Sequence, residues 1–203
     1  MIKSMAREIL DSQLQAVTKV TEVLDDHFVG VIELLESCTG KVIVSGLGKS
    51  GHIGRKIAAT LASTGTPAFF VHAAEALHGD LGMISSSDLL IAISNSGTSP
   101  EIVSMARHAR SFAGMVIAMT SNPSSELAQM ADRLLLLPKV SESDLWGLAP
   151  TNSTTIMLVL GDIVAITLSR RKGFSQEQFF RSHPGGALGQ TLLSLGLIEN
   201  AKK

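Results

Sequence analysis

Residues 88–101, DLLIAISNSGTSPE, decide the fold, because they join an apolar run to an expected helix through a loop of hydroxyl side chains. Residues 89–93 are all apolar, and a run without polar alternation is typical of a strand buried on both faces. Pro100 favours the first turn of a helix, where its missing N–H leaves no bond unmade. The stretch therefore predicts a buried strand, a loop and a helix, in that order.

The loop between them, residues 94–99, is predicted to bind a phosphate ester. It carries four hydroxyl side chains at a helix N-terminus, where backbone N–H groups and the helix dipole attract an anion. It contains no Lys or Arg, so the cradle would be built from hydroxyls and amides. The alternative is a Ser/Thr-rich turn that only caps the helix, and the spacing alone leaves that alternative open.

Composition sets the broad class of protein. The chain has 203 residues, 45% of them hydrophobic, and carries 17 Lys and Arg against 18 Asp and Glu. This charge balance gives no electrostatic reason to expect nucleic acid or an anionic membrane as a partner. Cys38 is the single cysteine, which excludes an internal disulfide framework and fits a reducing compartment. The first ten residues lack the apolar core of a signal peptide, so we expect a cytoplasmic protein.

Apolar runs alternate with helical segments along the chain. This alternation predicts an α/β protein with a doubly wound, mostly parallel five-stranded sheet flanked by helices. Ligands of such sheets bind at the carboxyl ends of the strands. The expected strands are residues 41–45, 68–71, 89–93, 115–119 and 133–137. The expected helices are residues 52–62, 100–112, a short helix after Pro123, and the apolar segment 151–170. Within that segment, the apolar stretch 155–168 contains Asp162 and is shorter than a bilayer requires.

The N-terminal segment shows an a/d seam of apolar residues at alternating steps of four and three. The seam consists of Leu10, Leu14, Val17, Thr21, Leu24, Phe28, Val31 and Leu35. It predicts a helix that packs either on its own domain or on another subunit. We expect one domain over residues 1–203, with N-terminal helices in 4–38, an α/β core in 41–173, and a C-terminal helix and tail in 174–203.

Residues 46–51, GLGKSG, match the spacing of a dinucleotide fingerprint, but the match is incomplete. The acid expected at the end of the second strand is replaced by His72, and Glu75 lies slightly beyond it. A Walker loop would need glycine where Ile43 stands. The glycines still allow a ligand to approach the backbone, and Lys49 and Ser50 are predicted to face the same edge as the hydroxyl loop.

Two further segments carry polar side chains on the same predicted edge. Residues 72–80, HAAEALHGD, hold two histidines and two acids that could bind a metal, although their spacing matches no common zinc pattern. The loop after the fifth strand, residues 138–144, brings Glu142 toward the ligand loops. A solvated loop acid is the alternative interpretation of Glu142.

Five motifs together resemble the sugar isomerase (SIS) domain family, and within it the D-arabinose 5-phosphate isomerases. They are SNSGTSPE (94–101), GLGKSGHIG (46–54), SESD (141–144), LAPTNSTT (148–155) and SHPGGALG (182–189). The resemblance covers about residues 8–193. Longer members of the family continue into a pair of CBS domains, and residues 194–203 do not resemble the start of such a pair.

The resemblance implies an aldose–ketose isomerase that interconverts D-ribulose 5-phosphate and D-arabinose 5-phosphate through an enediolate, without a cofactor. Its product would feed synthesis of 3-deoxy-D-manno-octulosonate for lipopolysaccharide or capsule. The family forms homotetramers with active sites near subunit interfaces. The implied catalytic residues are Lys49, Glu101, Glu142, His183 and His78. The implied substrate contacts are Ser50, Gly65, Thr66, His72, His78, Ser94, Asn95, Ser96 and Ser99, and His72 is also a point for inhibitory zinc.

The chemistry suggests a role for each group. Glu142 would move a proton between C1 and C2, with partial burial raising its pKa toward the working pH. Lys49 would stabilise the enediolate charge, and His183 or His78 would open the sugar ring. Glu101 would orient Lys49 or move the hydroxyl proton. The alternatives are an isomerase for another sugar phosphate, a non-catalytic sugar-phosphate sensor, and a nicotinamide-dependent oxidoreductase that uses GLGKSG.

Overall fold

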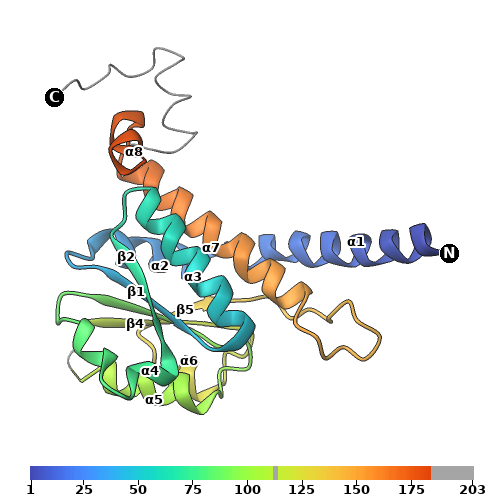
Figure 1. Ribbon diagram of the computed structural model, residues 1–203, viewed down its shortest axis with the longest axis horizontal. Helices are drawn as coiled ribbons and strands as arrows, with labels where there is room; N and C mark the ends of the chain where they lie inside the picture. Colours follow the sequence, from blue (N-terminus) through green and yellow to red (C-terminus); the bar gives the residue numbers. More distant parts are fainter. Residues whose placement is uncertain (112–113, 184–203) are drawn as a thin grey trace.

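The computed structural model describes residues 1–111 and 114–183, and its centre is a five-stranded sheet (Figure 1). The strand order is β2-β1-β3-β4-β5, and every pairing is parallel. The expected doubly wound parallel sheet is thus confirmed. Its strands are β1 (Val42–Gly46), β2 (Ala68–His72), β3 (Leu89–Ile93), β4 (Met115–Thr120) and β5 (Arg133–Leu136).

Helices cover both faces of the sheet. One core cluster joins α2 (Asp26–Ser37), α3 (Gly48–Ser63) and α7 (Asn152–Arg171) to one face, which includes Val44. The other cluster joins α4 (Ala73–Ala76), α5 (Pro100–Ala109) and α6 (Glu126–Met130) to the opposite face, which includes Ile43. All five residues of β3 are buried, as an apolar strand covered on two faces requires. The remaining elements are α1 (Ile2–Thr18), η1 (Lys19–Val23), η2 (Asp80–Met83) and α8 (Gln176–Ser182).

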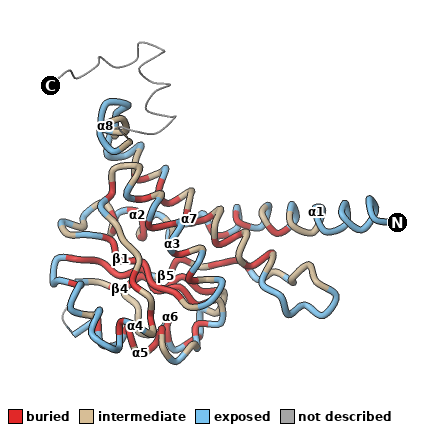
Figure 2. The backbone as a smooth tube through the Cα atoms, in the orientation of Figure 1, coloured by how far each residue is buried: buried red, intermediate tan, exposed pale blue. Residues whose placement is uncertain are grey.

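The N-terminal segment is helical, as expected, but its a/d seam does not lie on a single helix. The chain breaks into α1, the short 3₁₀ helix η1 and α2, because the Asp25 carboxylate accepts hydrogen bonds from the amides of His27 and Phe28 and caps a new helix. Leu10 and Leu14 of α1 remain 53% and 56% exposed, although they belong to the predicted seam. Figure 2 shows most of α1 extending from the body with an exposed surface.

Helix α3 begins at Gly48, four residues before the predicted start. Its first turn packs closely on β1, because a Cβ at Gly51 would lie 3.0 Å from the carbonyl oxygen of Gly46. Lys49 and Ser50 therefore belong to the first turn of a helix and not to a free glycine loop.

Helix α7 is longer than the apolar stretch 155–168. Its 20 residues are long and apolar enough to cross a membrane by length and composition alone. Half of the relevant window is buried inside the protein, as in the core helix of a globular domain. Asp162 in its middle pairs with Lys56 of α3, so this helix also carries an ion pair on its surface.

Candidate active site

The loops after β1 and β3 meet at the point where the sheet changes direction. Gly46 at the end of β1 lies beside Ile93 at the end of β3. The chain continues from β1 to one edge of the sheet and from β3 to the other, so the carboxyl ends of these strands form a topological switch point. Open α/β sheets bind their ligands at this position.

The hydroxyl loop forms a compact turn at this switch point. The Ser94 hydroxyl lies 3.0 Å from the Ser99 hydroxyl and accepts a hydrogen bond from the Gly97 amide at 3.1 Å. The Ser96 hydroxyl accepts from the Thr98 hydroxyl at 3.0 Å. Gly97 has φ +70°, and a Cβ there would lie 2.0 Å from the Ser125 hydroxyl, so only glycine fits this turn. The loop is thus a compact turn of hydroxyls and amides, which are groups that can bind an anion.

Two helices start beside this loop, and each presents a charged residue in its first turn. Lys49 is an exposed residue of α3, and Glu101 is a half-buried residue of α5. In the described part of the chain, no side chain caps the start of either helix. Their first-turn amides are therefore available to an anion. The structure brings Lys49, Ser50 and Glu101 to the same edge as the hydroxyl loop, as predicted.

A turn after β4, which the sequence reasoning did not assign to the site, holds Asn95. The carbonyl of Asn95 accepts hydrogen bonds from the Thr120 hydroxyl, the Ser121 amide and the Ser121 hydroxyl at 2.9–3.0 Å. The sequence contains a signal for this turn, since Thr120 ends β4, the neighbour of β3, and Ser121 stands just before Asn122-Pro123.

Glu142 is bound by the first residues of α7. One carboxylate oxygen, Oε2, accepts from the Thr151 amide at 2.8 Å, the Thr151 hydroxyl at 3.0 Å and the Ser153 amide at 3.1 Å. Burial raises the pKa of Glu142, but the hydrogen bonds from Ser153 and Thr151 together lower it by more. The pKa therefore lies below its usual value. The expectation that the pKa of Glu142 is raised toward the working pH is therefore wrong, and Glu142 is ionised at neutral pH.

The packing of α3 against α7 places Glu142 and Lys49 toward the same edge of the sheet. The two helices run side by side, with Gly161 packed against Ile57 and Lys172 bonded to Thr66 just beyond the end of α3 (Figure 1). Because these contacts pair the middle of α3 with the middle of α7 and the end of α3 with the end of α7, the helices are parallel. Their first turns, which carry Lys49 and the Glu142 contacts, lie toward the same edge of the sheet.

His72 and His78 lie on the carboxyl side of β2, as expected. His72 is the last residue of β2, and its Nδ1 is buried without a hydrogen-bond partner. His78 is exposed, and its amide donates to the Glu75 carbonyl. Nowhere in the described residues do three His, Cys, Asp or Glu side chains gather as metal ligands.

Gly65, Thr66 and His183 lie on the other side of the molecule. Gly65 and Thr66 precede β2, at the amino edge of the sheet, and the length of α3, about 24 Å, separates them from Lys49. His183 ends α8, where its ring stacks on Phe179 at 4.0 Å. One protomer therefore does not bring these three residues to the hydroxyl loop. The motif residues 184–189 lie outside the described residues.

The amino-edge residues are held by the segment that follows α7. Gly65 has φ +94°, and a Cβ there would lie 2.3 Å from the ring of Phe174. The Lys172 ammonium donates to the Thr66 hydroxyl at 3.0 Å. The segment between α7 and α8 is thus fixed on the turn between α3 and β2.

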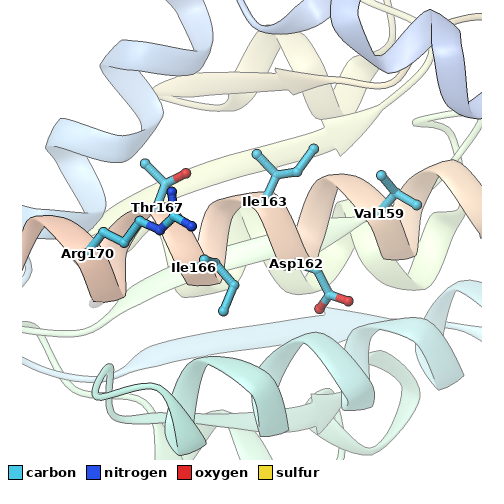
Figure 3. A pocket seen from close by; sticks show the side chains of 6 residues that line it. All are labelled: Val159, Asp162, Ile163, Ile166, Thr167 and Arg170. Carbon is cyan, nitrogen blue, oxygen red and sulfur yellow. The ribbon is translucent and has the colours of Figure 1, made fainter. Parts of the chain in front are cut away.

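An open hollow of about 440 Å³ lies along α7 (Figure 3). Its lining combines Val159, Ile163 and Ile166 with the polar Asp162, Thr167 and Arg170. It has none of the predicted site residues, so its size does not make it the active site.

Comparisons with known proteins agree on one family. A model of the SIS domain matches residues 35–167. The chain is 48% identical over 187 residues to the arabinose 5-phosphate isomerase KdsD of Salmonella typhi, covering 92% of this chain and 57% of that protein. It is 50% identical over 188 residues to the Pseudomonas aeruginosa protein of the same name, covering 93% of this chain and 58% of that protein. The solved structure of Escherichia coli CFT073 c3406 in complex with arabinose 5-phosphate aligns with a TM-score of 0.85 and 44% identity, covering 90% of this chain and 97% of that one.

Proposed function

The chain belongs to the SIS domain family, and on that premise we propose that it interconverts D-ribulose 5-phosphate and D-arabinose 5-phosphate. It spans 57% and 58% of the length of the two curated relatives described above, both named arabinose 5-phosphate isomerases. The related Escherichia coli structure was solved with arabinose 5-phosphate and is covered almost completely. The product would enter the synthesis of 3-deoxy-D-manno-octulosonate.

The observation that carries this proposal is the grouping of complementary charges at the switch point. The hydroxyl loop and two uncapped helix starts offer hydrogen-bond donors to a phosphate. Lys49 supplies a positive charge beside them, and Glu142 supplies an ionised carboxylate from the same side of the molecule. A sugar-phosphate sensor needs the first feature and has no use for the other two.

The reaction assigns a step to each group. The Glu142 carboxylate removes the C2 proton of the aldose, the electron pair forms the C1–C2 double bond, and the negative charge moves to O1. Lys49 stabilises that charge. The proton then returns to C1, while the O2 hydroxyl proton passes to O1, in which Glu101 assists. His78 or His183 opens the sugar ring.

The lowered pKa of Glu142 has a consequence for this mechanism. The carboxylate is present in its basic form throughout the neutral range, but its low pKa makes it a weak base. Binding of a sugar in place of water would raise that pKa by desolvation, which strengthens the base where it is needed.

The homotetrameric state also belongs to the proposal. Helix α1 extends from the body with Ile2, Met5 and Ile9 exposed, and the loop before α7 exposes Trp146 by 78%. A neighbouring subunit would cover these apolar side chains. His183 lies apart from the hydroxyl loop of its own chain. In an oligomer, a neighbouring subunit could supply its His183 to that loop. A cytoplasmic location is proposed from the single cysteine and the reducing environment that it suits.

The test is an assay of pentose and hexose phosphates for aldose–ketose interconversion, run in heavy water. The proposal predicts turnover of ribulose 5-phosphate and arabinose 5-phosphate, with deuterium appearing at C2 of the aldose. Turnover confined to another sugar phosphate would identify a different isomerase. Binding of sugar phosphates without turnover would identify a sensor, and binding of a nicotinamide dinucleotide would favour the oxidoreductase.

A further inference from the structure

Three consecutive loop residues are bound by three consecutive residues at the start of α7. We call residues 141–143 and 151–153 the Glu142 clamp. Besides the bonds to Glu142, the Thr151 hydroxyl accepts from the amide and the hydroxyl of Ser143, both at 2.9 Å. The Asn152 side-chain amide donates to the Ser141 carbonyl at 2.8 Å. The backbone on both sides of Glu142 is therefore fixed to the same helix turn as its carboxylate.

Asn152 also connects the clamp to α1. Its Nδ2 donates a second hydrogen bond, to the Ser12 hydroxyl at 2.8 Å, and the residue is only 2% exposed. Both bonds use the nitrogen, and turning the amide over would place its oxygen against the Ser141 carbonyl, so the acceptor fixes the orientation. Close by, the Lys19 ammonium of η1 donates to the carbonyl of Lys139, two residues before the clamp, at 3.4 Å.

Helix α1 packs against α7, and Ser12 lines one hollow together with Ser141 and Asn152. Its first ten residues are exposed, and Ala16 is its one buried residue. Ser12 lies on the part of α1 that faces the start of α7, one turn before Ala16. The hydrogen bond from Asn152 is thus a direct polar connection between the N-terminal helix and the turn that binds Glu142.

We propose that Asn152 and Ser12 are positioning residues for Glu142, through which α1 sets the place of the carboxylate that moves the proton. The catalytic consequence rests on the proposed isomerase function. The hydrogen bonds of the Asn152 side chain go to Ser12 and Ser141. It fixes the Ser141 carbonyl next to Glu142, and a misplacement of about 1 Å lowers a rate by about 100-fold.

The test compares hydroxyl removals at two positions of the same helix. Ser12→Ala removes the partner of Asn152, whereas Thr18→Ala removes a hydroxyl that bonds only to the Leu14 carbonyl one turn earlier. Ser12→Ala is expected to lower kcat by about 3- to 10-fold with little change in KM, and Thr18→Ala to leave both unchanged. Asn152→Ala should lower kcat by about 10- to 100-fold. The Ser12→Ala/Asn152→Ala double variant should be no slower than Asn152→Ala, because both act through one connection.

Two readouts distinguish positioning from a loss of folded protein. In Asn152→Ala, the acid limb of the kcat/KM profile should move to higher pH, because Glu142 loses alignment with the hydrogen-bond donors that lower its pKa. A smaller amount of native enzyme would lower the activity at every pH and leave that limb in place. Amide exchange, measured without substrate, should quicken at Thr151 and Ser153 in Ser12→Ala but not in Thr18→Ala. If no sugar phosphate is turned over, the proposed isomerase function fails. Amide exchange still tests the connection between Ser12, Asn152 and the Glu142 clamp, because it needs no substrate. Unchanged exchange at both amides in Ser12→Ala and Asn152→Ala would overturn the inference.

Discussion

Replacing Glu142 by Gln tests the proposed proton transfer with little change in shape. The Gln carbonyl oxygen can accept the three hydrogen bonds that reach Oε2 from Thr151 and Ser153, but it carries no charge and cannot take a proton. We expect kcat to fall by about two to four orders of magnitude, while KM changes little.

The same substitution has a smaller, separate effect on stability. Converting charge-assisted hydrogen bonds into neutral ones costs about 1–2 kcal/mol, or about 2–8 °C in Tm for a chain of this size. The pKa of Glu142 is lower in the folded protein than its ordinary value of 4.5, so its stabilising effect is present above that value. It is lost as the pH falls through the folded pKa. The difference in Tm between wild type and Glu142→Gln should therefore shrink in acid.

The assays are steady-state turnover of arabinose 5-phosphate and thermal unfolding at neutral and acid pH. Asp144→Asn is the matched control, since Asp144 is a second carboxylate of the same loop that binds the amides of Trp146, Leu148 and Ala149. The control should lose charge without losing turnover. Near-normal turnover by a folded Glu142→Gln protein would refute the assignment of the base.

Three further predictions address the phosphate cradle, the amino edge and the assembly. Ser94→Ala should raise KM by about 10- to 100-fold, because Ser94 joins the hydroxyl network of the loop. Equal binding of arabinose and arabinose 5-phosphate to the wild type would argue against a phosphate site at this loop. Gly65→Ala should lower the free energy of unfolding by about 1–3 kcal/mol, since φ is +94° and Phe174 covers the site, and an unchanged Tm would contradict this packing. Glu142→Gln and His183→Asn proteins, unfolded and refolded together, should regain activity if His183 serves a neighbour's site. Proven subunit exchange without recovery would exclude that arrangement.

The sequence predicted the sheet because its signals are local. An apolar run, a loop of small polar residues and Pro100 lie within 14 residues at β3 and α5, and each signal acts on its own neighbourhood. At the N-terminus, the periodicity of apolar residues did not by itself locate the boundary between two helices. The Asp25 carboxylate ends one pattern and caps the next helix, although the apolar spacing continues across it.

In the candidate site too, the features that depend on local sequence were predicted, and those that depend on distant residues were not. Residues that follow strands, such as Lys49 and Ser94, were placed correctly because parallel strands end at one edge. The low pKa of Glu142 was missed, because it depends on the direction of the amides at Thr151 and Ser153, nine and eleven residues further along the chain. Thr151 was recognisable as a helix-start residue type, but its attachment to Glu142 was not.

The position of Gly65, Thr66 and His183 constrains how a complete site can form. Gly65 and Thr66 precede β2, so the direction of the sheet alone assigns them to the edge opposite the hydroxyl loop. The separation is about the length of α3, or about 24 Å, which a five-carbon sugar phosphate does not span. The Lys172 and Phe174 contacts hold this edge in place, so closing the gap within one chain would require breaking them. Gly65 and Thr66 would therefore contact a sugar phosphate bound at the hydroxyl loop only if a second copy presented its amino edge to the carboxyl edge of the first.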